Sequence, residues 1–409
     1  MSSPYAALKI KDFRLFISAR FCVTLAIQVQ AVVVGWQVYE ITRDPLSLGL
    51  IGLAEAIPSI GVSLYAGHLA DIVARKKIIL ITLTTLVFCS GALLFFTLDI
   101  GSFILSHGVS PIYAVIFISG IARGFITPAL FSFMPQLVPR ELYQNAISWN
   151  STLWEMASIG GPPIGGLVYG FFGITAAYTI DAGLMVVGLI LAILVGNRVL
   201  PPATEEQGIF EKIKAGLKFV FENKLVLSAI TLDLFAVLFG GAVALLPIFA
   251  DEILHVGKIG LGFLRSAPGI GALLMALYIT HYPIRKKMGK ILLYAVGGFG
   301  LSMILFAIST HFWISMVLLI FSGACDCISV IVRGTLLQTL TPENMKGRVA
   351  AVNNIFIGSS NEIGAFESGV AARLMRVIPS VIFGGVMTII VVIVTSWKAP
   401  TLRKLESVT

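Results

Sequence analysis

Residues 67–77 read Gly-His-Leu-Ala-Asp-Ile-Val-Ala-Arg-Lys-Lys, and they separate two long apolar runs. The stretch is short and polar, with one acid followed by a cluster of basic side chains. A membrane-spanning helix needs roughly 20 largely apolar residues, and the flanking runs are of that order. The stretch therefore predicts a hairpin of two spanning helices whose turn meets water.

The composition extends this prediction to the whole chain. Of its 409 residues, 57% are hydrophobic and 12% are charged, whereas a soluble domain has about 25% charged residues. Only helices and closed barrels satisfy the backbone in lipid, so we predict an all-α fold with twelve spanning helices. The twelve apolar runs lie near residues 14–39, 46–69, 78–99, 111–135, 143–171, 174–196, 225–250, 258–281, 290–308, 312–337, 348–374 and 378–397.

Basic residues set the expected orientation. With the N-terminus inside, the inside segments hold 21 Lys and Arg residues and the outside loops hold four. Cytoplasmic loops carry such an excess, so we expect a multi-pass protein of the cytoplasmic membrane with both termini in the cytoplasm. The net charge of +8 then reflects loops that face anionic lipid, and the bilayer rather than nucleic acid is the expected partner.

The longest polar stretch divides the runs into two sets of six. We place an N-terminal bundle at 1–197, a cytoplasmic linker at 198–224 and a C-terminal bundle at 225–409. The linker has apolar residues at helical spacing, which indicates either an amphipathic helix at the membrane interface or a solvated linker helix. A weak repeat relates the two bundles at a spacing of 203 residues, as in transporters built from two pseudo-symmetric halves. The matched pairs are Pro139/Pro342, Asn150/Asn353, Gly161/Gly364 and Gly166/Gly369.

At this point the chain resembles the major facilitator superfamily over essentially its whole length. Gly67, Asp71, Arg75 and Lys76 are similar to the signature of that superfamily's loop between the second and third spans. The basic side chains can anchor the loop to phosphates or to helix C-termini. The resemblance implies that Asp71 meets the start of the eleventh span and holds the outward-facing state.

Residues 161–166 read Gly-Pro-Pro-Ile-Gly-Gly within the fifth run. Gly161 and Gly165 share a helix face and let another helix approach closely, while Pro162 removes a backbone hydrogen bond and bends the span. With Gly166, these residues resemble the fifth-span motif associated with exporters, although generic helix packing is the alternative. The resemblance favours efflux over uptake.

Three further runs sharpen the family. Residues 36–42, 52–58 and 245–249 resemble the branch that contains the enterobactin exporters and the macrolide-efflux proteins. The branch implies an organic substrate that is siderophore-like or drug-like. The runs do not identify the molecule.

Ionisable residues inside spans are costly and mark functional positions. In the superfamily the first, fourth, seventh and tenth spans line the central cavity, and the resemblance puts several polar residues there. The other charged residues within spans can instead fix the packing of the helices. The candidates for a substrate or proton pathway are Thr24, Gln28, Glu55, Arg123, Asp233, Asp326, Arg333 and Glu362.

The spacing of the charges suggests a division of roles. Asp326 and Arg333 are seven residues apart, so they share one face of the tenth span. A paired acid stays ionised, whereas an unpaired acid can take up a proton. Asp233 has no basic neighbour within its own span, and we expect it to be the proton carrier. Asp181, at the outer start of the sixth run, is expected to be a surface acid.

The leading hypothesis is secondary active export of an organic solute by alternating access, coupled to inward proton flow, by a monomer without a cofactor. A primary pump is not expected, since no Gly-x4-Gly-Lys-Ser/Thr motif is present. An enzyme is not expected either, because the five histidines form no HExxH or similar cluster. A metal-ion exporter of the same fold is the alternative. It would need converging His, Cys or carboxylate ligands, and the sequence offers no such metal site.

Overall fold

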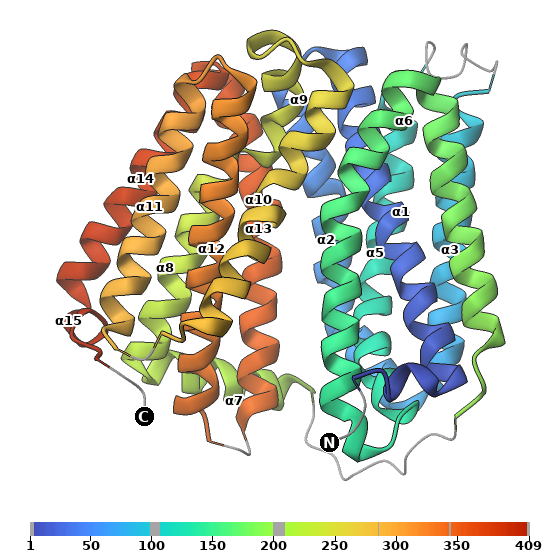
Figure 1. Ribbon diagram of the computed structural model, residues 1–409, viewed down its shortest axis with the longest axis horizontal. Helices are drawn as coiled ribbons and strands as arrows, with labels where there is room; N and C mark the ends of the chain where they lie inside the picture. Colours follow the sequence, from blue (N-terminus) through green and yellow to red (C-terminus); the bar gives the residue numbers. More distant parts are fainter. Residues whose placement is uncertain (1–3, 99–106, 199–208, 285, 343–344, 407–409) are drawn as a thin grey trace. The chain divides into compact units, whose positions relative to one another are not determined.

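The structure is a computed structural model that describes residues 4–98, 107–198, 209–284, 286–342 and 345–406. These residues form helices and no strand, which confirms the predicted all-α fold (Figure 1). The helices are α1 (Lys11–Thr42), α2 (Pro45–Ile72), α3 (Arg75–Phe95), α5 (Ser110–Phe133), α6 (Tyr143–Leu194), α7 (Ile209–Glu222), α8 (Lys224–Gly240), α9 (Leu246–Ile248), α10 (Gly257–His281), α11 (Met288–Ile308), α12 (Phe312–Leu340), α13 (Lys346–Met375), α14 (Val377–Lys398) and α15 (Pro400–Arg403).

Ten helical segments of the described chain are long and apolar enough to cross a membrane. One of them, Arg140–Leu194, has 55 residues and contains α6, whose helical geometry is interrupted at Gly173 (φ 83°, ψ 176°). Glycine adopts this positive φ without steric cost. α13 is as long as its neighbours but more polar. Dividing α6 at Gly173 and adding α13 gives the twelve helices that the sequence predicts.

The seventh predicted run is not one continuous helix. α8 ends at Gly240, and the chain continues as the short turns η4 (Ala242–Leu245), α9 and η5 (Phe249–Ile253). Pro247 is the second residue of α9, where its ring removes an amide donor and crowds the carbonyl four residues earlier. The Ser368 hydroxyl of α13 donates to the freed carbonyl of Gly241 at 2.9 Å. A broken spanning helix with a satisfied backbone is typical of transporter binding regions.

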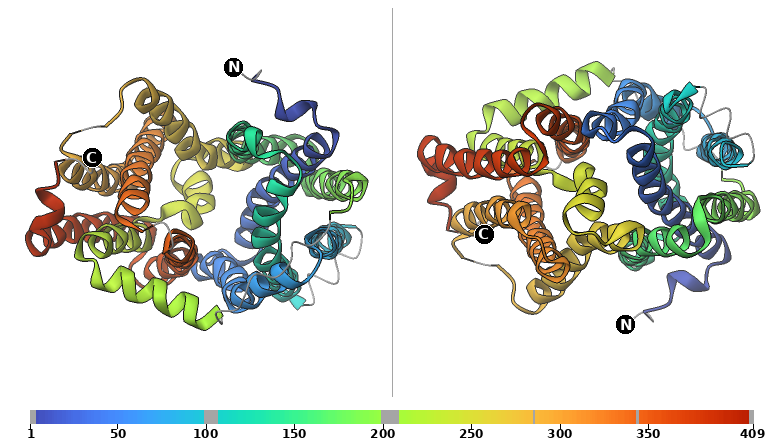
Figure 2. Two further views of the ribbon diagram at one scale, coloured as in Figure 1. Left: turned by 90° about the horizontal axis from the view of Figure 1, so that it is seen from below. Right: turned by 90° about the horizontal axis from the view of Figure 1, so that it is seen from above.

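The chain divides into two compact units, and the first is built mainly from α1, α2, α3, α5 and α6. Unit 1 comprises Met1–Arg43, Ala54–Glu205 and Gly257–Ser266. α1 lies along α6, and α3 packs on both α5 and α6, as the views of Figure 2 show. Asp12 at the start of α1 contacts Arg198 beyond the end of α6. The chain therefore enters α1 and leaves α6 at the same end of unit 1, as an even number of crossings requires.

Unit 2 comprises Asp44–Leu53, Glu206–Val256 and Ala267–Thr409. Its main helices α8, α11, α12, α13 and α14 pack on one another. Leu225 at the start of α8 and Leu402 of α15 belong to one apolar cluster. This unit too begins and ends at one of its ends.

The helix predicted in the linker is α7, but its apolar face is covered by protein. Val220 is fully buried in a cluster with Val226 of α8 and Val349 of α13. In Figure 1, α7 lies across the ends of α8 and α13. The helix predicted for the linker therefore docks on unit 2 through Val220.

Each unit also contains the beginning of one helix that was predicted to belong to the other six-helix bundle: the start of α10 in unit 1 and the start of α2 in unit 2. In unit 1, a Cβ added to Gly262 of α10 would lie 2.5 Å from the carbonyl oxygen of Pro162 on α6. In unit 2, a Cβ added to Gly369 of α13 would lie 2.9 Å from the Cα of Gly49 on α2. Small residues allow this approach of backbones. The repeat-matched Gly166 and Gly369 thus each lie at a close helix contact, since a Cβ added to Gly166 would lie 2.7 Å from the carbonyl oxygen of Lys258.

Candidate functional site

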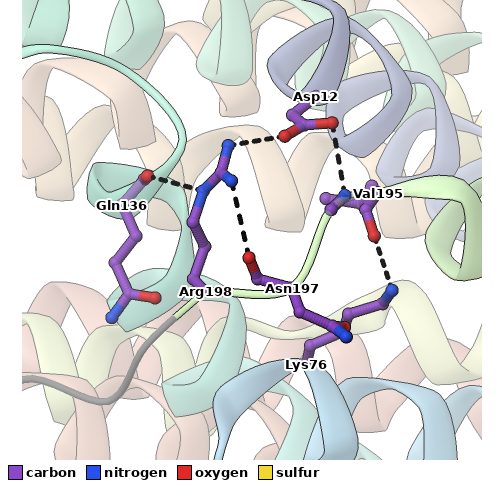
Figure 3. Close-up of polar contacts among 7 residues, drawn as sticks. Asp12, Lys76, Gln136, Val195, Asn197 and Arg198 are labelled. Atoms are coloured by element: carbon purple, nitrogen blue, oxygen red, sulfur yellow. Dashed lines mark hydrogen bonds and ion pairs between the residues drawn. The ribbon is translucent and has the colours of Figure 1, made fainter.

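The loop between α2 and α3 is anchored to the end of α6. The Lys76 ammonium donates to the carbonyl of Ile193 at 2.9 Å. It also donates to the carbonyl of Val195 (Figure 3). A cation at a helix C-terminus satisfies free carbonyls and the helix dipole. The predicted anchoring of the basic cluster to a helix C-terminus is confirmed for Lys76. Arg75 begins α3 beside it.

The segment after α6 is held on its other side by α1. Arg198 pairs with Asp12, and its Nε donates to the Gln136 carbonyl at 3.1 Å. The Gly196 amide donates to Asp12 Oδ1 at 3.2 Å (Figure 3). These contacts fix the ends of α1, α3, α5 and α6 together within unit 1. The predicted contact of Asp71 with the eleventh span lies outside the description, because the side chain of Asp71 is not among those described.

The fifth-span glycines pack against α1. A Cβ added to Gly161 would lie 2.4 Å from the Cβ of Gln28, and one added to Gly165 would lie 3.1 Å from the Val29 carbonyl oxygen. Real Cβ atoms essentially never come within 3.0 Å of another atom and seldom within 3.4 Å, so α6 approaches α1 at these glycines more closely than a larger residue would allow. Pro162 remains inside α6 without ending the helix.

Unit 1 contains a polar network whose residues come from five helices, α1, α2, α3, α5 and α6. Arg123 of α5 forms an ion pair with Glu55 of α2. Its second nitrogen donates to the Gln30 side-chain oxygen of α1 at 3.3 Å. The Gln30 amide nitrogen donates in turn to Asp181 Oδ2 of α6 at 3.2 Å, and it lies 3.4 Å from the Ser90 hydroxyl oxygen.

Asp181 is not the surface acid that the sequence predicts. Its side chain is fully buried, and Oδ1 is a buried atom without a hydrogen-bond partner among the described residues. The prediction was wrong because α1 and α3 pack along α6 and cover the part of it that follows Gly173, including Asp181. The sequence signal that was available is the pair Gln30 and Asp181, polar residues within apolar runs.

In unit 2, Asp233 of α8 is paired with Arg333 of α12, and both side chains are buried. Ser329 donates to Asp233 Oδ1 at 3.2 Å. Asp233 was expected to be unpaired because its own span offers no basic neighbour, but Arg333 of another helix supplies one. Arg333 was expected beside Asp326, but its ion-pair partner is Asp233.

A small pocket opens beside this ion pair. Asp326 is half-buried and lines the pocket together with Asp233, while Phe299 supplies an aromatic wall. No salt bridge to Asp326 is found within the described part of the chain. The complete lining is Asp233, Ala236, Val237, Val296, Phe299, Cys325, Asp326 and Ser329.

The remaining predicted pathway residues lie on α1 and α13. Thr24 and Gln28 are half-buried on α1. In unit 2, a Cβ added to Gly52 of α2 would lie 3.1 Å from Glu362 Oε2, which places Glu362 of α13 against the first turns of α2. Within the described residues, no three His, Cys, Asp or Glu side chains gather as metal ligands would.

Comparisons with known proteins agree with this architecture. The sequence model of a family described as transmembrane secretion effector matches residues 2–408. Enterobactin exporter EntS of Shigella dysenteriae serotype 1 (strain Sd197) is 26% identical over 378 residues, which are 90% of this chain and 87% of that protein. Enterobactin exporter EntS of Escherichia coli O1:K1 / APEC has the same identity and the same coverage.

Similar solved structures are transporters. The POT family transporter PepTSo matches with a TM-score of 0.76 at 13% identity, covering 96% of this chain and 98% of that chain. The D-xylose-proton symporter matches with a TM-score of 0.72 at 13% identity, covering 94% and 96%. At such identities the likeness concerns the fold. The chain therefore belongs to the transmembrane secretion effector family of the major facilitator superfamily, and it is a multi-pass membrane transporter rather than an enzyme.

Proposed function

We propose that the protein exports a siderophore-like or drug-like organic solute across the cytoplasmic membrane in exchange for protons. The observation that carries the proposal is the pocket of unit 2, where an acid and an aromatic ring meet beside a buried ion pair. The direction of transport is supported by relatives named as enterobactin exporters. The fifth-span glycine and proline motif supports the same direction.

In this structure the pocket has room for about one water molecule, but its lining has the chemistry of a surface that contacts a partly apolar organic group. Its walls are apolar apart from Asp233, Asp326 and Ser329, and ligand sites usually combine such walls with a few polar groups. Arg333 balances the charge of Asp233. Asp326 is then the acid that can accept a hydrogen bond or meet a positive charge on the solute.

Proton coupling is supported by the number of acids within spans. Each unit has one arginine in its network, and each has two nearby carboxyl groups. An intramembrane charge is costly, so an excess carboxyl group is a candidate for carrying a proton. Asp233 is a weaker candidate than the sequence suggests because Arg333 holds it as an ion. Glu55 and Glu362 follow as candidates, and Thr24, Gln28, Arg123 and Asp326 as groups that contact the solute.

We further propose a monomer that works by alternating access, with both termini in the cytoplasm. The excess of basic residues in the predicted inside segments supports this orientation. Asp71 in the loop signature would hold the outward-facing state by meeting the start of α13. The anchoring of Lys76 to the end of α6 supports a role of this loop in fixing helix ends.

Flux measurements in proteoliposomes test the function. Purified protein is reconstituted, a pH gradient is imposed, and the movement of enterobactin, a macrolide and a divalent metal ion is followed in parallel. We expect uphill movement of at least one organic compound that stops when a protonophore collapses the gradient. Protein-free liposomes control for leakage.

The same assay addresses the metal-ion alternative. Gradient-driven metal flux without organic flux would contradict the proposal and support a metal-ion exporter. Organic flux that is indifferent to the pH gradient would retain export but remove proton antiport.

A further inference from the structure

We propose that Asp181 is the group of unit 1 that binds and releases the transported proton, and that Gln30 couples it to the Arg123–Glu55 ion pair. This inference rests on the proposed proton antiport and names the residue that would perform it. Asp181 was not among the pathway residues predicted from sequence. Its role is inferred from burial, from its hydrogen bonds and from the balance of charges around it.

The surroundings of Asp181 favour a neutral carboxyl group. The side chain has no exposed surface, and Oδ1 has no hydrogen-bond partner among the described residues. A carboxylate buried with a bare oxygen is costly, whereas a carboxylic acid carries its proton on such an oxygen. Oδ2 accepts from Gln30 at 3.2 Å, a bond that the neutral acid can also accept.

The charges around Asp181 leave room for one proton. The groups that face it are Gln30 of α1, Cys89 and Ser90 of α3, Arg123 of α5 and Tyr178 of α6, with Glu55 of α2 behind Arg123. Arg123 is the cation among these described groups, and it is already paired with Glu55. With Glu55 and Asp181 both ionised the network has one negative charge in excess. One proton on Asp181 makes it neutral.

The bridge through Gln30 gives the proton a mechanical effect. In the structure, Arg123 contacts both Glu55 and the Gln30 side-chain oxygen, whose amide nitrogen contacts Asp181. In the observed state Asp181 is sealed, so it loses its proton when the helices around it open to water: the O–H bond then breaks and the proton passes to that water. The new carboxylate then attracts Arg123, which lies on the other side of Gln30. Arg123 moves towards Asp181, and its ion pair with Glu55 is broken. Protonation of Asp181 restores the observed pairing.

The position of Glu55 connects this exchange to transport. The side chains of Glu55 and Arg123 are 26% and 19% exposed, whereas Asp181 is sealed. A freed Glu55 can therefore contact water or solute, while the proton site itself does not. When Asp181 carries the proton, Arg123 pairs with Glu55. When Asp181 has lost it, Arg123 turns to Asp181 and Glu55 is available to the solute.

Infrared spectroscopy of the purified protein tests the proton site without a solute. We expect the wild type to show a carboxylic acid C=O band during a pH titration that Asp181→Asn lacks. Tyr178→Phe is the matched control, because it lies on the same helix face and loses only its hydrogen bond to Gln37. That variant should keep the band. A band that persists unchanged in Asp181→Asn would overturn the proposal.

Transport with enterobactin as the probe gives the second readout. In Asp181→Asn we expect accumulation against a gradient to fall to the level seen without a pH gradient, while solute exchange continues. Gradient-driven accumulation at the wild-type level would also overturn the proposal. If the wild type shows the band but exports regardless of pH gradient, the proposed antiport fails while the proton site stands.

A second variant covers the case in which Asp181→Asn does not insert. Gln30→Met removes the bridge while keeping a side chain of similar length. It should retain the C=O band, shift the pH at which the band appears and weaken coupled export. An unchanged titration together with unchanged coupling would contradict the role of Gln30 and overturn the proposed linkage.

Discussion

The polar networks of the two units have similar components but different burial. In unit 2, the Arg333 and Asp233 side chains are 4% and 7% exposed and contact each other directly. In unit 1, the Arg123 and Glu55 side chains are 19% and 26% exposed, and Gln30 links the arginine to a second acid. A buried ion pair is costly to separate, whereas a partly exposed pair can exchange partners. The difference suggests that the unit 2 pair holds structure beside the pocket and that the unit 1 pair can move.

The largest expected effect is the loss of one partner of the sealed pair. Arg333→Met leaves Asp233 buried without its cation and should lower the free energy of unfolding by about 3–5 kcal/mol. The measurement is unfolding of the purified protein in detergent. Adding Asp233→Leu to this variant removes the orphaned charge and should recover most of the loss. Equal stability of Arg333→Met and the wild type would show that the pair is not structural.

The next effect concerns the α1–α6 contact that brings Gln30 to Asp181. A Cβ at Gly161 would lie 2.4 Å from the Gln28 Cβ, whereas a Cβ at Gly160 meets no atom within 4 Å. Gly161→Ala should cost about 1–3 kcal/mol through overpacking and should impair export. Gly160→Ala is the matched control and should do neither. Similar behaviour of the two variants would mean that the α1–α6 approach is not tight.

A smaller effect is expected at the exchangeable pair. Glu55→Gln should lower the free energy of unfolding by about 1 kcal/mol, less than Arg333→Met, because water can still reach Arg123. Measuring both variants in the same unfolding assay tests the comparison between units directly. A loss at Glu55 as large as that at Arg333 would remove the distinction between a fixed and a movable arginine.

The smallest effect is expected at the end of α6, the helix that carries Asp181. Lys76→Ala removes the donor to the Ile193 carbonyl and should cost about 0.3–1 kcal/mol. Hydrogen exchange of the last amides of α6 should quicken. Lys77→Ala removes the same charge from an exposed side chain and serves as the control. If hydrogen exchange of these amides is equally fast in both variants, the effect is due to the loss of a positive charge and not to the contact of Lys76 with α6.

Several features of the site could be predicted because they depend on local sequence. Gly161 and Gly165 share a face at any helix packing, and Lys76 follows a turn that must lie near helix ends. The position of Arg123 within an apolar run already marked it as costly and therefore functional. The positions of these residues on their own helices could be predicted from the sequence, whereas their partners on other helices came from the tertiary structure.

Other features depended on which helices become neighbours. The spacing of Asp326 and Arg333 predicts a shared face, yet Arg333 reaches across to Asp233. The break after Gly240 could have been anticipated from Pro247, but its stabilisation by Ser368 could not. An arginine side chain is long enough to reach acids on several neighbouring helices. The spacing of residues along one helix does not predict which of these acids it will pair with.

By itself, the sequence determined that this chain spans a membrane with helices, since hydropathy and the cost of unsatisfied backbone groups in lipid act on each segment separately. It also determined which residues would be costly inside the membrane. Only the tertiary structure decided that Asp181 is sealed rather than exposed, and that Arg333 pairs with Asp233. Burial and ion pairing are set by neighbouring helices distant in sequence, and the hydropathy of one run contains no information about those neighbours.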